Sequence, residues 1–224
     1  ARTRFGLATM LESTQALYDR LVRPTGMATT PSPAANRESL RILVVTSIYP
    51  TNEEPELGIF VASQVESLRA RGHHIDVLFL DVRSSKWELL CGISEVRRKT
   101  KSGSYDLVHA HFGYNGVPAV TQRDIPTVVS FCGTDLVKPR IRPISRWVAR
   151  RADACIVKSE FLSGFLDEDT DIIPNGIDLD HFCPTDRKEA RHRLGLQPSL
   201  RYALFPTNPA RPEKRFELAT HALR

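Results

Sequence analysis

The sequence lacks the segments that would assign a function at once. It has no run of about 18 consecutive apolar residues, so we expect no membrane-spanning helix. No GxxxxGK segment followed by Ser or Thr occurs, and no GxGxxG follows the first apolar run. These absences argue against a P-loop ATPase and against a dinucleotide-dependent enzyme. Aromatic residues make up 8% of the chain and form no stacking platform beside its basic residues, so we expect no nucleic-acid partner.

Cysteine is also scarce. The four cysteines are Cys91, Cys132, Cys155 and Cys183; no two form a CxxC pair, and none has zinc-ligand spacing with a histidine. This usage is typical of a reducing cytosol, so we expect a cytoplasmic protein.

The remaining composition is ordinary for a soluble globular protein. Hydrophobic residues make up 41% and charged residues 25% of the 224 residues. The net charge of +5 permits an anionic partner, such as a phosphate or an acidic membrane surface, without requiring one.

The first 40 residues differ in composition from the rest of the chain. Residues 1–22 could form one weak helix, and residues 24–36 are rich in Thr, Pro, Ser and Ala, as a linker would be. We therefore expect residues 1–40 to be an N-terminal extension and linker outside the core fold.

From Arg41 onward, apolar runs alternate with amphipathic segments. Strands are expected at 42–45, 75–80, 107–110, 127–131, 154–157 and 171–173, and helices at 60–72, 87–101, 116–122, 144–152 and 160–166. This alternation predicts an α/β fold with a doubly wound parallel sheet. We assign residues 41–182 to one Rossmann-like domain.

The pattern changes again after Phe182. A charged helix is expected over 186–194, a strand over 202–205 and a helix over 213–223. We interpret residues 183–224 as a linker and the first strand and helix of a second α/β domain, which is truncated at Arg224.

Ligands of open parallel sheets bind at the carboxyl ends of the strands, and the first two candidate positions lie there. Gly58 follows the first strand where a helix begins, which suits either a tight turn or an anion on the helix amides. His109 and His111 end another strand and face the same way. A hydrogen-bonding or acid–base role for His111 and a core position, especially for His109, are both open, and a metal pair lacks a third ligand.

The third position is the segment Cys132-Gly133-Thr134-Asp135 after the strand 127–131. The glycine would let a ligand approach the backbone. Asp135 could accept hydrogen bonds from sugar hydroxyls or cap the next helix. Cys132 could act as a nucleophile only with an activating base, and the sequence assigns none.

Two basic segments complete the set. Arg211 and Lys214 lie three apart at an expected helix start, where the helix dipole and both cations would suit a diphosphate; a surface turn is the alternative. Residues 138–151 carry six Lys or Arg residues, which suit either a peripheral contact with anionic lipid or a solvated helix face.

The order of these motifs resembles the retaining glycosyltransferases of family 4, which have the two-Rossmann GT-B architecture. The matching pieces are "RILVVTSIYP" with "GIFVASQVESLRARGHHIDVL", then "YDLVHAHFG", "VVSFCGTDL", "ADACIVKSEFL", "IIPNGIDLDHF" and "ARPEKRFELATHAL". They cover about residues 41–224.

This resemblance implies transfer of a sugar from a nucleotide-sugar donor to a carbohydrate, lipid-linked or small-molecule acceptor, with the anomeric configuration retained. It implies that the amide of Gly58 and the pair Arg211 and Lys214 bind the donor diphosphate without a metal. It implies catalytic roles for His111 and Asp135. It also implies a cleft lined by Gly133, Thr134 and Asn175.

The chain departs from the family pattern in two ways. Cys132 stands where the family often has His, and only Gly58 represents the paired glycines of the first loop. The acidic EX7E segment that grips the donor would fall beyond Arg224. We therefore expect this chain alone to have little or no activity. A non-catalytic sugar-binding or lipid-phosphate-binding module derived from the same fold is the alternative.

Overall fold

The structure is a computed structural model that describes residues 5–22, 39–82, 85, 87–210 and 212–223. The chain divides into two units, Ala1–His181 and Phe182–Arg224, and each is considered by itself.

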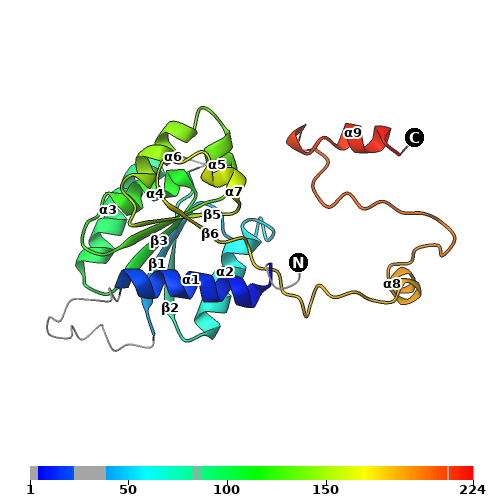
Figure 1. The fold of residues 1–224 in the computed structure, drawn as a ribbon, viewed down its shortest axis with the longest axis horizontal. Helices are drawn as coiled ribbons and strands as arrows, with labels where there is room; N and C mark the ends of the chain where they lie inside the picture. The colour runs from blue at the N-terminus through cyan, green and yellow to red at the C-terminus, as the bar shows by residue number, and fades with distance from the viewer. Residues whose placement is uncertain (1–4, 23–38, 83–84, 86, 211, 224) are drawn as a thin grey trace. The chain divides into compact units, whose positions relative to one another are not determined.

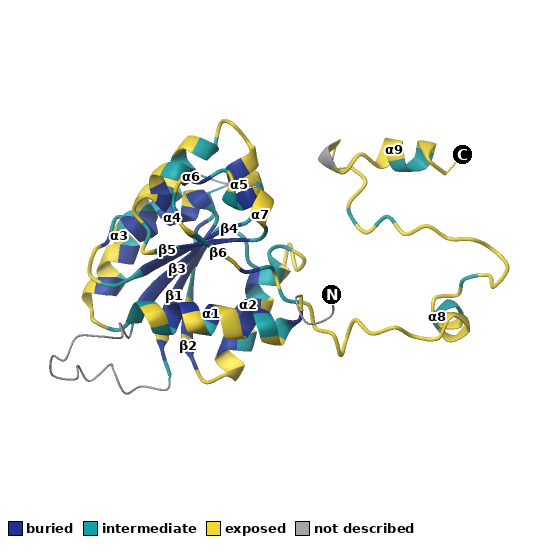
Figure 2. Ribbon diagram, in the orientation of Figure 1, coloured by how far each residue is buried: buried dark blue, intermediate teal, exposed yellow. Residues whose placement is uncertain are grey.

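The first unit is built on a six-stranded sheet in the order β2-β1-β3-β4-β5-β6. All neighbouring strands are parallel. The strands are β1 Arg41–Thr46, β2 His74–Phe79, β3 Leu107–His111, β4 Thr127–Phe131, β5 Ala154–Val157 and β6 Thr170–Ile172. The central strands β3 and β4 are buried at every position, as Figure 2 shows, because helices cover both faces of the sheet. The predicted Rossmann-like sheet is confirmed.

Two helical layers enclose the sheet (Figure 1). One hydrophobic cluster joins it to α3, α4, α5, α6 and α7, and a second joins its other face to α1 and α2. The helices are α1 Leu7–Val22, α2 Ile59–Ala70, α3 Trp87–Lys101, α4 Gly113–Val120, α5 Thr134–Val137, α6 Arg142–Ala149 and α7 Glu160–Ser163. The short helix α5 is not among the sequence expectations.

Helix α1 contradicts the expectation that residues 1–40 lie outside the core. Its apolar stripe includes Leu17 and Tyr18, which are fully buried against the sheet. Gly6 forms a parallel bridge with Ile177, and the Arg20 guanidinium donates to the Asp171 carboxylate at 2.8 Å. Composition did not reveal this docking because the helix gains its stability from tertiary packing rather than from its own propensity. The linker expected at 24–36 lies outside the described residues.

The second unit contains α8 Arg187–Arg193, the 3-10 helix η2 Pro212–Lys214 and α9 Phe216–His221. The expected strand at 202–205 is wrong, since residues 201–206 carry neither helix nor strand. No other strand lies among the described residues of this unit, so the backbone of 202–205 has no ladder partner there. The expected helix 213–223 is broken at Arg215, whose φ of 55° lies in the left-handed region.

Candidate functional site

The carboxyl ends of the strands differ in character between the two faces of the sheet. On the face covered by α3, α4 and α6, the residues near the strand ends are apolar: Val45, Ala110, Phe131 and Val157. On the face covered by α1 and α2, the side chains near the same ends are polar. They are Thr46, His111, Ser130 and Lys158, as the alternation along each strand requires. Ligands of parallel sheets bind at this edge, so its polar face is the candidate site.

Gly58 shapes the loop that leads from β1 to α2. Its φ is 68°, and a Cβ at this position would lie 2.5 Å from the carbonyl oxygen of Ile48. Only glycine fits both restrictions without strain. The expectation that the turn requires a glycine is therefore confirmed, and it leaves the Gly58 backbone directly at the start of α2.

His109 is a core residue held by two hydroxyl groups. Its Nδ1 lies 2.6 Å from the Tyr18 hydroxyl of α1, and its Nε2 lies 2.8 Å from Oγ of Ser130. Each hydroxyl can donate or accept, so either neutral tautomer is satisfied. Burial lowers the pKa of His109 to about 3, and the ring stays neutral. Both ring nitrogens are engaged, so His109 has none free to ligate a metal.

His111 lies beside His109, with the two rings stacked at 4.5 Å. It is 1% exposed, and burial holds its pKa well below the ordinary value. Its Nδ1 is buried without a hydrogen-bond partner among the described residues. Asn115 donates to the His111 carbonyl at 2.6 Å, but its own Oδ1 is also without a partner. Two buried polar atoms near the end of β3 therefore lack the partners that such atoms normally have.

Asp135 is occupied by the backbone of two strand-end turns. Its carboxylate accepts from the amides of Gly133 at 2.8 Å, Gly113 at 3.1 Å and Cys132 at 3.2 Å. The side chain is 3% exposed, and desolvation raises the pKa of Asp135 against the lowering effect of these amides. Asp135 lies within the first turn of α5 and forms no N-cap hydrogen bond there; instead its carboxylate connects the turns that follow β3 and β4.

Burial makes the Cys132 thiol a poor nucleophile. It raises the pKa of Cys132 to about 12, so the thiolate is scarce near neutral pH. The Sγ atom makes a weak contact of 3.7 Å with the Ser130 carbonyl oxygen.

Lys158 is the residue that sequence reasoning missed. It directly follows β5 and is partly buried, and its charge lowers the pKa of His109 and of His111. The signal was present, since Lys158 ends the apolar run 154–157 in the same way that His111 ends its own strand. Phe112 was also missed; its φ of 72° is unusual for a residue with a side chain and places a strained turn at the same edge.

The three residues expected to line the cleft differ in exposure. Gly133 has a φ of 124° and Thr134 is exposed, and both lie where β4 turns into α5. Asn175 is exposed after β6, next to Gly176, where a Cβ would lie 2.7 Å from Cα of Leu7 in α1. Gly133 and Thr134 therefore lie at the same turn as Asp135, whereas Asn175 lies beside the docked α1.

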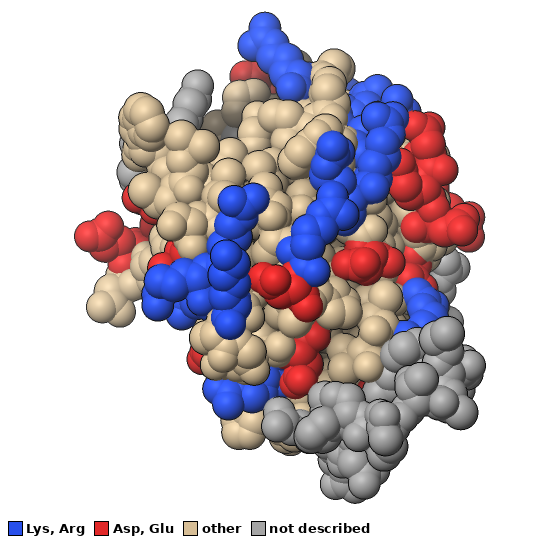
Figure 3. Space-filling model, turned by 90° about the vertical axis from the view of Figure 1, so that its left-hand side faces the viewer, with Lys and Arg blue, Asp and Glu red and all other residues tan. Residues whose placement is uncertain are grey.

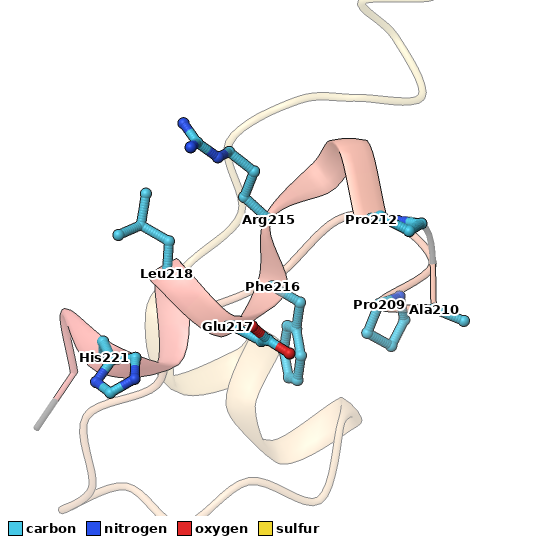
Figure 4. A pocket seen from close by; sticks show the side chains of 8 residues that line it. All are labelled: Pro209, Ala210, Pro212, Arg215, Phe216, Glu217, Leu218 and His221. Atoms are coloured by element: carbon cyan, nitrogen blue, oxygen red, sulfur yellow. The ribbon is translucent and has the colours of Figure 1, made fainter.

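The expected diphosphate pair lies in the second unit. Lys214 is exposed at the end of η2, and Arg211 lies outside the described residues. Beside Lys214, an open pocket of about 580 Å³ is lined by residues between Pro209 and His221 (Figure 4). Proline and Phe216 side chains line part of it, and the Arg215 side chain extends away from them.

Most arginines of the basic stretch 138–151 are engaged in contacts within the protein. Arg142 donates to the carbonyls of Leu136 and Val137, and Arg146 donates to that of Phe165. Arg150 pairs with carboxylates, and the Arg151 guanidinium lies 4.2 Å from the Trp147 ring centroid. This pattern favours the solvated-face interpretation of the stretch. On the side of the molecule that carries α3, positive and negative side chains are interspersed (Figure 3).

The described residues lack two further features. No helix among them is long and apolar enough to cross a membrane. They also contain no cluster of three or more His, Cys, Asp or Glu side chains that could hold a metal ion.

Known proteins similar to this chain include several glycosyltransferases. The chain is 30% identical over 129 residues to a D-inositol 3-phosphate glycosyltransferase of Actinosynnema mirum, a match that covers 48% of this chain and 31% of that protein. It is 26% identical over 242 aligned positions to the putative teichuronic acid biosynthesis glycosyltransferase TuaC of Bacillus subtilis, covering 80% and 61%. The D-inositol 3-phosphate glycosyltransferase of Mycolicibacterium gilvum is 30% identical over 136 residues, covering 51% and 31%. The matches thus span between about a third and three fifths of these relatives.

The sheet and its strand-end turns are also the part of the chain that a family model matches. The model is that of Glycosyltransferase Family 4, and it matches residues 41–181, from the first residue of β1 to the last residue of the first unit. The chain therefore belongs to Glycosyltransferase Family 4.

Proposed function

We propose that this chain carries the acceptor-side domain of a glycosyltransferase that moves a sugar from a nucleotide-sugar donor to an acceptor with retention of configuration. The family match over residues 41–181 carries this proposal. The relatives' names support glycosyl transfer in general. The polar strand-end edge of the first unit offers a site for an acceptor, as parallel sheets commonly do.

The proposal assigns a role to each candidate residue. The Gly58 amide at the start of α2 faces the donor diphosphate, because a helix N-terminus favours anions. Asp135 acts as a positioning residue for the Gly133–Thr134 turn, since its oxygens are held by backbone amides. His111 remains the candidate for hydrogen bonding within the cleft. Lys214, together with Arg211, neutralises the leaving diphosphate in place of a metal.

The 224 residues alone are proposed to have little or no transferase activity. The segment that would grip the donor sugar is expected after Arg224, and the described part of the second unit forms no sheet. Sugar transfer by the purified chain, followed as release of nucleoside diphosphate from several nucleotide sugars, should stay at the background rate. Robust turnover would overturn this part of the proposal.

Where the reading frame continues past Arg224, the longer protein provides the direct test. It should form a glycoside with the same anomeric configuration as the donor, read by NMR of the product. A Lys214→Met variant should lose about 100-fold in rate, because a cation at the leaving diphosphate acts mainly in the transition state. Lys188→Met changes an exposed cation of α8 and serves as the matched control. An inverted product, or equal rates for both variants, would count against the assignment.

The alternative is a binding module without catalysis. The engagement of Asp135 by three amides and the raised pKa of Cys132 favour it, because neither side chain is free to react. It predicts saturable binding of a sugar or lipid phosphate by the longer protein, with no release of nucleoside diphosphate.

A further inference from the structure

Lys158 is unusual because no carboxylate pairs directly with its ammonium group. Among the residues that the structure describes, none forms a hydrogen bond or an ion pair with it. Burial lowers its pKa, so the protein gives up part of the hydration of this cation. By contrast, Arg150, which precedes β5, is exposed and contacts two carboxylates. A partly buried cation without a partner costs stability unless something compensates it.

The register of the sheet places Lys158 next to the other polar strand ends. Ser130 of β4 aligns with His111 of β3 on one side and with Ile156 of β5 on the other. Lys158 lies two residues beyond Ile156 and therefore on the same face of the sheet. After burial and His109, the positive charge of Lys158 also lowers the pKa of His111, as expected of groups at the same edge.

Asp135 is the nearby carboxylate that could serve as a counter-ion, but its oxygens are directed elsewhere. It raises the pKa of Lys158 through its charge, yet it forms no ion pair with it. Its hydrogen bonds go to backbone amides of the two strand-end turns. The charge of Lys158 is therefore only partly balanced from within the protein.

His111 provides a second, independent observation at the same edge. The side chain is almost fully buried, and its Nδ1 has no partner among the described residues. An unpaired buried nitrogen destabilises the fold, because it has lost its hydrogen bonds to water. At the ends of β3 and β5, which flank β4, the fold thus holds one unpaired polar nitrogen and one unpaired cation.

We propose that Lys158 and His111 form a binding site for an oxyanion carried by the acceptor, a phosphate monoester being the group that fits best. A phosphate oxygen supplies the missing negative charge to Lys158 and has further lone pairs for a histidine N–H. That the oxyanion belongs to the acceptor rests on the proposed function, whereas the anion site itself does not. The donor diphosphate is the other source of such a group, and the experiment separates the two.

The test measures binding of inorganic phosphate and of inositol 3-phosphate to the purified 224-residue chain by calorimetry, at constant ionic strength. Both should bind saturably, and uridine diphosphate should bind no more tightly than inorganic phosphate. Lys158→Gln should weaken phosphate binding by at least about tenfold, and Lys158→Arg should retain most of it. Lys101→Gln, at an exposed position in α3, should bind like the wild type.

Equal phosphate affinity for Lys158→Gln and Lys101→Gln would overturn the inference, and so would tighter binding of uridine diphosphate through Lys158. If Lys158→Gln does not fold, NMR of the wild-type chain decides instead. Saturating phosphate should shift the ring resonances of His111, because the anion raises its pKa, and unchanged resonances would refute the site. Phosphate binding at Lys158 without glycosyl transfer by the longer protein would refute the proposed function alone.

Discussion

Replacing Asp135 by Ala tests whether this carboxylate holds the strand-end turns together. The side chain is 3% exposed and accepts three backbone hydrogen bonds, from Gly113, Cys132 and Gly133. Two of these amides belong to the turn after β4, and the third belongs to the turn after β3. The substitution therefore removes the shared acceptor of two loops that line the candidate site.

The magnitude follows from the three bonds and their opposing cost. A hydrogen bond to a charged group contributes about 1.5–3 kcal/mol, and an unpaired buried donor costs a similar amount. Desolvation of the carboxylate, which raises the Asp135 pKa, offsets part of this gain. Cys132 and Gly133 are only partly buried, so water can replace the bonds to their amides. We expect Asp135→Ala to lower the free energy of unfolding by about 3 kcal/mol, and Asp135→Asn by about half of that.

Urea unfolding followed by far-UV circular dichroism measures this loss. Asp169→Ala is the matched control, since Asp169 is exposed and has no hydrogen bond or ion pair with a described residue. Its free energy of unfolding should stay within about 0.5 kcal/mol of the wild type. If Asp135→Ala changes the free energy of unfolding as little as Asp169→Ala does, the carboxylate does not stabilise the fold, and a direct role in catalysis would explain it better.

Three further predictions concern the β1 loop and the docking of α1. Gly58→Ala should destabilise the first unit by more than Gly103→Ala. The two glycines have nearly equal φ angles, 68° and 67°, but only a Cβ at Gly58 would collide with backbone atoms. Urea midpoints of both variants measure the difference, and equal losses of stability would contradict the collision. Tyr18→Phe should cost about 1–3 kcal/mol in the same assay by leaving His109 without one partner, whereas Tyr114→Phe, at an exposed position, should cost little. Because the folded pKa of His109 is depressed to about 3, its contribution to stability is complete above the ordinary value of 6.5 and is lost as the pH falls towards 3. At pH 5 this loss is about 2 kcal/mol relative to pH 8, and a His109→Gln variant should show a correspondingly flatter pH profile.

The sheet could be predicted from sequence because its strands carry an unambiguous signal. A parallel strand covered by helices on both faces needs apolar residues at nearly every position, as in Arg41–Thr46 and Thr127–Phe131. Each such run was expected within one or two residues of its observed bounds. The sequence defines the helix boundaries less closely, because capping geometry such as the positive φ of Phe112 before α4 has no signature in composition.

Two expectations failed because they depended on partners that lie far away in the chain. Helix α1 was placed outside the core, although its Tyr18 is completely buried and bonded to His109, 91 residues later. The strand at 202–205 was expected from its apolar residues, but a strand also needs a neighbouring strand for its backbone hydrogen bonds. The local sequence pattern indicates which conformation a segment prefers, but not whether the segment has a partner to pack against or to hydrogen-bond with.

At the candidate site, the sequence likewise identifies the residues but not whether their polar atoms are already hydrogen-bonded. The sequence correctly drew attention to strand-end residues, including His111 and Asp135. It could not show that three amides already occupy Asp135, nor that Lys158 would be left unpaired, because both facts depend on side-chain geometry.

The strand ends are apolar on one face of the sheet and polar on the other, and this contrast favours the polar face as the binding face. Packing alone would favour apolar side chains up to the strand ends on both faces, as Phe131 and Val157 illustrate on one of them. On the other face, the docked α1 satisfies His109 through Tyr18, but His111 and Lys158 lie beyond this contact and remain unpaired. Polar groups that weaken a core without mutual compensation are expected where a ligand completes them. The missing partners of His111 and Lys158 are therefore the physical argument for the anion site proposed at this face of the sheet.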